Sequence, residues 1–384
     1  MCQRGAARAA PHFKRRENEM DWHEELRRKL DLFPIGLPRM EETMKILRLL
    51  FSEEDARIAA HVPNPPLLFT AKAIAGKAGV YADDAARALR GMAERGLIVE
   101  QKFLVEFRYT LMPAVPGFME MQFMKGQVID EKRREAGELW HKALAGEFGE
   151  ENYGYPTSGV RTLPVRKTIG AGQRVFSFEE ADRVARASGS IAVAECACRK
   201  SARKCDAPLE VCMFFGMTAD YLVGRDLARK LTPRQAAKNL EMTSDAGLVH
   251  VATNTKPPVS IICSCCSCCC ASLRGVVSLN KPASSVASNF RAESAPGSKC
   301  VLCGVCAKAC PADAITMGAE RAEVSQDRCI GCGVCAHKCP AGALTLVRKT
   351  KETPFPTSLH LTAKMMTERN KLGGLLESIA KDLL

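Results

Sequence analysis

The feature that most constrains this chain is a run of four cysteines that occurs twice near the C-terminus. Both runs follow the pattern C-x2-C-x2-C-x3-C-P, and they occupy residues 300–311 and 329–340. The similarity continues beyond the two prolines, because residues 311–317 read PADAITM and residues 340–346 read PAGALTL. The segment is therefore an internal duplication, and its cysteines are the most regular part of the repeat.

The spacing of these cysteines suits a four-iron cubane, which needs a thiolate at each of four corners. Gaps of two residues let three successive sulfurs of one tight loop face a single centre. Zinc sites favour two CxxC pairs separated by a longer spacer, and tandem four-cysteine runs do not have that form. Gly304 and Gly333 leave room for backbone N–H groups to approach cluster sulfur. The runs therefore predict iron–sulfur clusters.

Residues 298–348 resemble the two-cluster bacterial ferredoxin family in both runs and in the repeated segments that follow them. The resemblance implies two [4Fe-4S] clusters, in which the fourth cysteine of each run ligates the other cluster. It also implies β-hairpins, built from residues 314–325 and 343–347, that shield the clusters from water. The implied ligand sets are Cys300, Cys303, Cys306 and Cys339 for one cluster, and Cys329, Cys332, Cys335 and Cys310 for the second.

The distribution of cysteines bears on the cellular compartment. Of the 19 cysteines, one is Cys2 and the other 18 lie from Cys196 onward. Cysteines clustered at such spacings indicate metal ligation rather than disulfides, and hence a reducing compartment. Residues 1–20 lack the apolar core of a secretory signal, and no apolar stretch reaches transmembrane length. We therefore expect a cytoplasmic protein, without membrane insertion, of a bacterial or archaeal anaerobe.

The middle of the chain, residues 177–292, is predicted to be an α/β domain. The capping box at Ser177–Glu180 starts a helix that runs to about Ala187. A second capping box, at residues 232–235, starts another helix with a proline in its first turn. This region looks like one that is fused to dicluster ferredoxins in anaerobic bacteria, and that likeness adds context without a mechanism.

Strands are predicted in the same region at residues 190–195, 248–253 and 258–262, and His250 in the second of them is expected to be a core residue. Two groups of cysteines follow the first and the last strand. Because ligands bind at the carboxyl edge of open α/β sheets, we expect the two groups to converge. The first group is Cys196, Cys198, Cys205 and Cys212, and the second is Cys263, Cys265, Cys266, Cys268, Cys269 and Cys270.

Ten thiols are more than one metal site needs, and eight would fill two cubanes. Three interpretations stay open: one or two additional [4Fe-4S] clusters, zinc or another structural metal, and redox-active or unligated thiols. The neighbouring cysteine runs favour the first interpretation, since a further cluster would extend the path of electrons. We expect Cys196, Cys198, Cys205 and Cys212 to ligate one centre, and we assign the second group only as possible further ligands.

The front of the chain resembles a winged helix-turn-helix domain. A helix pair is predicted at residues 70–77 and 83–95, and a wing-like hairpin at residues 96–111. Fold alone does not imply DNA binding, and Asp83 and Asp84 would face phosphate at the start of the second helix. DNA is therefore the disfavoured partner, and docking of a protein is the favoured role. The net charge of +12 fits either partner, as well as the negative charge of bound clusters.

These observations predict a multidomain α+β chain. The expected divisions are a charged helical arm (1–38), a winged-helix-like domain (39–125), a helix and connector (126–176), the Cys-rich α/β domain (177–292), the ferredoxin module (293–350) and a helical tail (351–384). The expected function is electron transfer through two [4Fe-4S] clusters, to or from a further Cys-ligated metal centre and a partner oxidoreductase. The alternative is an iron–sulfur-sensing winged-helix transcription regulator. The sequence shows no nucleotide or flavin motif, so an electron carrier or an oxidoreductase subunit is favoured over a self-contained enzyme.

Overall fold

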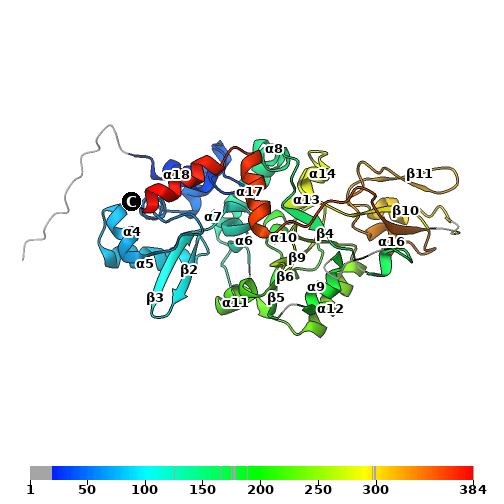
Figure 1. Ribbon diagram of the computed structural model, residues 1–384, viewed down its shortest axis with the longest axis horizontal. Coiled ribbons are helices and arrows are strands. Elements are labelled where there is room, and N and C mark those ends of the chain that lie inside the picture. Colours follow the sequence, from blue (N-terminus) through cyan, green and yellow to red (C-terminus); the bar gives the residue numbers. More distant parts are fainter. Residues whose placement is uncertain are drawn as a thin grey trace, which may run out of the picture.

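The computed structural model describes residues 20–383, apart from residues 125, 165, 174, 176–178, 188, 296 and 298–299. The molecule is elongated, with the N-terminal helices at one end, a six-stranded sheet in the middle and the two cysteine runs at the other end (Figure 1). Within these residues, no helix has the length and apolar character needed to span a membrane.

The N-terminal part consists of helices and a small antiparallel sheet. Its elements are α1 (Trp22–Asp31), α2 (Glu41–Leu50), α3 (Glu53–Ala59), β1 (Phe69–Thr70), α4 (Ala71–Ala78), α5 (Ala82–Glu94), β2 (Ile98–Phe103) and β3 (Glu106–Leu111), with strand order β1-β3-β2. The Thr70 hydroxyl caps the start of α4, and Gly79 ends that helix in the left-handed conformation. The helix pair and the hairpin lie where the sequence predicts them, and their relation to the winged-helix family stays a prediction.

Short helices connect the hairpin to the sheet. They are η1 (Ala114–Phe118), α6 (Met119–Met121), α7 (Glu131–Ala145) and α8 (Glu147–Tyr153). The sequence predicted one helix in the segment 126–176, whereas the structure has α7 and α8 there, which Gly146 separates. The region between α6 and α8 packs on the N-terminal helices, since Trp140, Leu144 and Phe148 belong to the same apolar core as α1 and α2.

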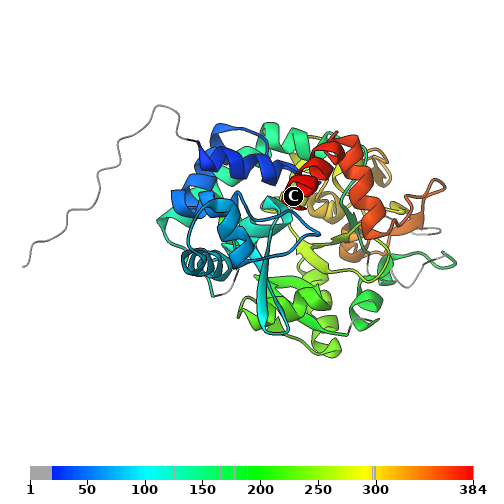
Figure 2. The ribbon, with the colours of Figure 1, turned by 60° about the vertical axis from the view of Figure 1, so that its left-hand side comes forward.

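The C-terminal tail is helical, as predicted, and folds back onto the N-terminal part. It forms α17 (Ser358–Glu368) and α18 (Leu372–Leu383), of which α18 lies beside the first helices of the chain (Figure 2). Two ion pairs join the ends of the chain: Lys29 Nζ lies 3.2 Å from an Asp382 carboxylate oxygen, and Lys371 Nζ lies 2.9 Å from Asp31.

The middle of the chain is built around one sheet with strand order β4-β8-β9-β6-β5-β7. Its strands are β4 (Val160–Thr162), β5 (Ile191–Glu195), β6 (Glu210–Phe215), β7 (Arg229–Lys230), β8 (Val249–Thr253) and β9 (Ile261–Cys265). Its helices, besides the short η2 (Arg166–Thr168), are α9 (Ala181–Ala187), α10 (Ala197–Ala202), α11 (Met217–Gly224), α12 (Pro233–Asp245), α13 (Ala271–Val277) and α14 (Pro282–Ser285). The predicted capping box of Thr232 and Gln235 is present at α12, whereas Ser177 of the other box lies outside the described residues.

The pairing of three strands brings the cysteines of this region to one edge of the sheet. Strand β6 pairs antiparallel with both β5 and β9, so β5 and β9 run in the same direction on either side of it. The carboxyl ends of β5 and β9 therefore lie beside the start of β6. In register, Cys212 of β6 is opposite Ala194 of β5 and Cys263 of β9.

Two expectations for these strands need correction. The last strand begins later than predicted, at Ile261, so Cys263 and Cys265 lie within β9 rather than after it. Strand β6 was not predicted, although Cys212 belongs to it. Its residues Val211 to Phe215 are buried without alternation, so the period of two that marks a half-exposed strand is missing.

The two cysteine runs form a compact module beside the sheet. It contains β10 (Phe290–Ser294), α15 (Val305–Ala309), β11 (Ile315–Met317), β12 (Ala322–Val324), α16 (Val334–Lys338) and β13 (Leu344–Arg348). Strands β11 and β12 form the expected hairpin. Strand β13 pairs instead with β10, whose residues precede the cysteine runs and were not predicted as a strand.

A buried ion pair fastens this module to the middle of the chain. Arg348 Nη1 of β13 lies 2.6 Å from Glu179 Oε2, and the two side chains are 9% and 2% exposed. The Asn289 amide also donates to Glu179, at 2.9 Å. Because a buried carboxylate needs such partners, these contacts fix the module's orientation on the sheet.

Replacing His250 by Gln should make the fold less sensitive to acid. Burial lowers the pKa of His250 to about 4, and its Nε2 lies 3.1 Å from the Thr243 hydroxyl. Between pH 6.5 and pH 4, His250 binds a proton in the unfolded chain but not in the folded protein. The folded protein is therefore stable relative to the unfolded chain above this window, and it loses stability as the pH falls through it. Because of the His250 imidazole, the free energy of unfolding of the wild type should be roughly 2 kcal/mol lower at pH 5 than at pH 7.5. Urea midpoints of wild type and His250→Gln, measured anaerobically at both pH values, test this, and equal losses in the two proteins would contradict it.

Candidate metal centres

Four thiols meet at the outer end of the module that contains the two cysteine runs. Cys300, Cys303 and Cys306 line a cavity of about 610 Å³ together with Cys339 from the other run. Gly304 takes a positive φ of 71° in this wall, and the Ala343 N–H donates to Cys339 Sγ at 3.2 Å. Cys303 is exposed, so this cavity opens close to the surface of the molecule.

The other four thiols of the cysteine-run module lie deeper, against the six-stranded sheet. Cys329, Cys332 and Cys335 line a smaller cavity with Cys310 from the first run. Backbone N–H groups point at two of the sulfurs, from Ala314 to Cys310 at 3.3 Å and from Ala292 to Cys329 at 3.4 Å. Burial raises the pKa of Cys335 to about 12.

Both cavities have the composition that a [4Fe-4S] cluster requires. Each brings together four thiols, three from one run and one from the other, which is the number of thiolates that a cubane binds. The N–H donors would stabilise thiolate charge, and hydrogen bonds of this kind tune cluster potential. The residues present therefore fit the group, and bound clusters would supply one-electron redox chemistry.

A third set of thiols meets at the cysteine-bearing edge of the sheet, and we call it the six-thiol chamber. Its thiols belong to Cys196, Cys198, Cys212, Cys263, Cys265 and Cys270. They line a cavity of about 190 Å³. The contributing elements are β5, β6, β9 and the start of α13.

Residues from distant parts of the chain complete the wall of the chamber. Glu120 of α6 is half-buried in this wall, and desolvation raises its pKa to about 7 even though the Gly117 N–H donates to it at 2.7 Å. The Tyr153 hydroxyl of α8 donates to the Ala271 carbonyl beside Cys270. Sequence reasoning missed both residues. Glu120 had one signal, because it is the only charged residue in the apolar stretch from residue 109 to residue 124.

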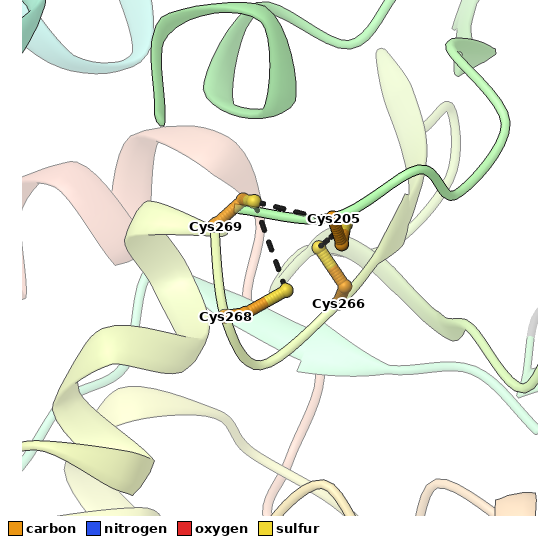
Figure 3. Close-up of side chains that lie close together, drawn as sticks. All are labelled: Cys205, Cys266, Cys268 and Cys269. Carbon is orange, nitrogen blue, oxygen red and sulfur yellow. Dashed lines mark hydrogen bonds between the residues drawn. The ribbon is translucent and has the colours of Figure 1, made fainter. Parts of the chain in front are cut away.

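A fourth set, the four-thiol site, lies in the loops just outside the chamber. It consists of Cys205, Cys266, Cys268 and Cys269, whose sulfurs all lie within 4.8 Å of one another (Figure 3). Cys205 Sγ is 3.8 Å from both Cys266 Sγ and Cys269 Sγ, and Cys268 Sγ is 3.7 Å from Cys269 Sγ. Three of the four thiols are half-buried and Cys269 is buried.

The structure groups the middle cysteines differently from the sequence-based expectation. The two groups do converge, but Cys205 does not join Cys196, Cys198 and Cys212. The reason is the course of the chain after α10, where Arg203 takes a left-handed conformation and leads Cys205 away from the sheet edge. The six cysteines from Cys263 to Cys270 also divide into two sets. Cys263, Cys265 and Cys270 line the chamber, while Cys266, Cys268 and Cys269 lie beside Cys205.

A buried arginine lies between the two sets. Arg199 of α10 is 2% exposed and donates to the Ser264 carbonyl at 3.2 Å. Its guanidinium also makes a hydrogen bond to Cys266 and interacts electrostatically with Cys196. Burial acts against its charge, but the neighbouring thiols outweigh that effect and raise the pKa of Arg199. The chain thus holds a fixed positive charge beside both sets of ligands.

Comparison with known proteins places part of this chain in a class. Residues 299–343 match the family model of the 4Fe-4S dicluster domain. The match covers both cysteine runs and stops short of the middle region. Neither the curated proteins nor the solved structures contain a significant match to the chain. The protein therefore carries a C-terminal 4Fe-4S dicluster domain, preceded by a cysteine-rich region with a cluster of thiols suited to a metal.

Replacing Gly331 by Ala should remove the second cluster. Gly331 lies between Cys329 and Cys332 with a positive φ of 61°, and a Cβ there would collide with the Phe290 carbonyl oxygen. Gly304 is the matched control, because it has a positive φ of 71° with no atom near the Cβ position. Gly331→Ala should lose about four irons per chain. Gly304→Ala should keep them, at a cost of about 1 kcal/mol in stability. Iron analysis of anaerobically purified proteins decides, and equal iron in both variants would contradict the assignment of this cavity.

Proposed function

We propose that this chain is an iron–sulfur electron-transfer protein with two [4Fe-4S] clusters in its dicluster domain and a further Cys-ligated centre in the six-thiol chamber. A partner oxidoreductase exchanges electrons with it at the outer end. In this proposal Cys300, Cys303, Cys306 and Cys339 hold the outer cluster, and Cys310, Cys329, Cys332 and Cys335 hold the inner one. Four of the six chamber thiols ligate the further centre.

The observation that carries this proposal is an apolar core shared by the inner cluster cavity and the chamber. Cys310, Cys329 and Cys332 pack in the same cluster of buried side chains as chamber cysteines Cys265 and Cys270. The residues between them, which include Val249, Val251, Ile330 and Val334, are all buried. The Thr162 hydroxyl ties the sheet to this region by donating to the Ile330 carbonyl at 2.9 Å. A dry, closely packed connection of this kind holds two redox centres at a fixed separation and excludes water from between them.

The outer cavity has the surface that a redox partner needs. Around the exposed Cys303, Val301 is 64% exposed and Leu302 is 46% exposed, and Met317 of β11 also reaches solvent. Exposed apolar side chains in one area mark sites of protein association. In the described residues the order is therefore an open end at Cys303, a buried inner cavity, and the chamber beyond it.

The chamber also meets the electrostatic needs of a further centre. Thiolates in a buried site require compensation of their negative charge, and Arg199 lies beside Cys196 for that purpose. Cys212 is the thiol whose pKa is held well below its usual range, through its hydrogen bonds with Cys196 and Cys263. Two chamber thiols remain in excess of the four that a cubane takes up.

Iron analysis combined with reductive titration tests the further centre. Anaerobically purified wild type should contain about twelve irons and accept about three electrons per chain. The double variant Cys263→Ser with Cys265→Ser should contain about eight irons and accept about two electrons. Cys2→Ser is the control, because Cys2 lies 194 positions before the next cysteine in the sequence, Cys196. About eight irons in the wild type would remove the further centre from the proposal and leave the two clusters of the dicluster domain.

A transcription regulator is the second candidate, and one contact favours it. Ala197 and Cys198 at the chamber pack into the apolar core that contains the N-terminal helices. A change in the chamber could therefore alter the packing of those helices. Against it, α5 begins with Asp83 and Asp84, which would repel phosphate.

Anisotropy of a labelled DNA duplex separates the two candidates. As an electron carrier, the protein should bind random-sequence duplex weakly, and with no difference between its oxidised and dithionite-reduced forms. Any binding should disappear as salt is raised from 50 to 200 mM, as non-specific phosphate contacts do. Salt-resistant binding to genomic fragments that changes with oxidation state would favour the regulator.

A further inference from the structure

We propose that the four-thiol site of Cys205, Cys266, Cys268 and Cys269 holds a single tetrahedral zinc ion and is a structural centre, distinct from the iron–sulfur centres. The electron-transfer proposal concerns the other thiol sets, so the two can fail independently. The spacing of the sulfurs, the closed set of ligands and the position of the site between two loops all favour this ion.

The spacing of the sulfurs matches one ion. A Zn–S bond is about 2.3 Å long, and a regular tetrahedron of that radius has S···S edges of about 3.8 Å. Three of the S···S separations in the site are 3.7, 3.8 and 3.8 Å, and all four sulfurs lie within 4.8 Å of one another. In a cubane each thiolate binds a different iron, so two ligand sulfurs are separated by two Fe–S bonds and an Fe–Fe edge. That separation is much longer than a tetrahedral edge.

The same molecule supplies the comparison. Among the residues described, no three of the eight dicluster-domain cysteines have sulfurs within 4.8 Å of one another. Nor do any three of the six chamber thiols. Within the described part of the chain, the four-thiol site is therefore the set in which three or more sulfurs lie close enough together to bind one ion.

The ligand set favours zinc over iron. Four cysteines close the coordination sphere, as in structural zinc sites, and leave no position for a substrate or water. For a given set of ligands, divalent zinc binds more tightly than divalent iron. The backbone N–H groups of Ala207 and Lys204 donate to Cys205 and Cys269, and the Arg199 guanidinium donates to Cys266. These donors offset the negative charge of a four-thiolate zinc site.

The position of the site indicates what the zinc does. Cys205 lies in the loop after α10, which begins at the chamber with Cys196 and Cys198. The other three ligands lie in the turn between β9 and α13, immediately before the chamber residue Cys270. One ion bound to both loops would hold the two walls of the chamber together. Metal binding at such a site contributes to folding, because the unfolded chain has no preformed site.

The first experiment uses the intact, anaerobically purified protein. Metal analysis should find about one zinc per chain, and zinc K-edge X-ray absorption should show four sulfur neighbours at about 2.3 Å. Growth in cobalt-supplemented medium should give the visible absorption of tetrahedral cobalt thiolate. Zinc well below one per chain, or a zinc shell with oxygen or nitrogen neighbours, would overturn the proposal.

The second experiment separates zinc from iron at the site itself. Cys268→Ser should lose at least half of the zinc while its iron content stays at the wild-type value. Ser267→Ala is the matched control, because Ser267 lies in the same turn, is half-buried and carries no thiol. Loss of about four irons from Cys268→Ser would instead place a cubane at the site, and loss of about one iron would make the ion iron; either result overturns zinc. If Cys268→Ser does not fold, the absorption experiment on the wild type still decides.

Discussion

The rest of the structure depends on how one antiparallel strand is placed between two others. Strand β6 separates β5 from β9, which run in the same direction, and so the cysteines at the ends of those strands reach the same edge. The register puts Cys212 directly across from Cys263. Without β6 the chamber would lack Cys212, which lies on the strand between the strand that leads to Cys196 and the strand that carries Cys263. Strand pairing, rather than sequence spacing, therefore sets which thiols meet.

This explains why the dicluster domain was predictable from sequence and the middle region was not. In the cysteine runs, three ligands of each set lie within seven residues, so local spacing already brings their sulfurs to one centre. In the middle region, Cys198 and Cys270 are 72 residues apart in sequence and meet only because the sheet forms. Cys198, Cys205 and Cys212 follow one another at intervals of seven residues, but this regular spacing does not place them at one site. The left-handed conformation of Arg203 directs the chain so that Cys205 joins another set of thiols. The contribution of Glu120 and Tyr153 depends on tertiary packing and had almost no local signal.

Buried arginines explain part of the excess positive charge. Arg161, Arg199 and Arg348 are large, cationic and largely withdrawn from solvent. Arg348 is neutralised by Glu179 and Glu352, and Arg161 donates to Asn254 and stacks on Phe355 with its guanidinium carbon 3.3 Å from the ring centroid. Arg199 instead donates to the carbonyls of Pro208 and Ser264 and lies beside thiols. Its charge makes energetic sense once thiolates are present, because an isolated buried cation is costly.

The arrangement of the sulfurs suits the thiol sets to different physical roles. The chamber and inner-cavity thiols share an apolar core, which can hold redox centres close to one another without exposing them to water. The four thiols of the loops lie close enough together to bind one ion, and such an ion would lie outside that shared core. Arg199 contacts both sets, so the charge of the structural site and the charge in the chamber act on the same guanidinium. A metal that fastens the chamber walls would thereby also influence the electrostatic environment in which the chamber thiols ionise.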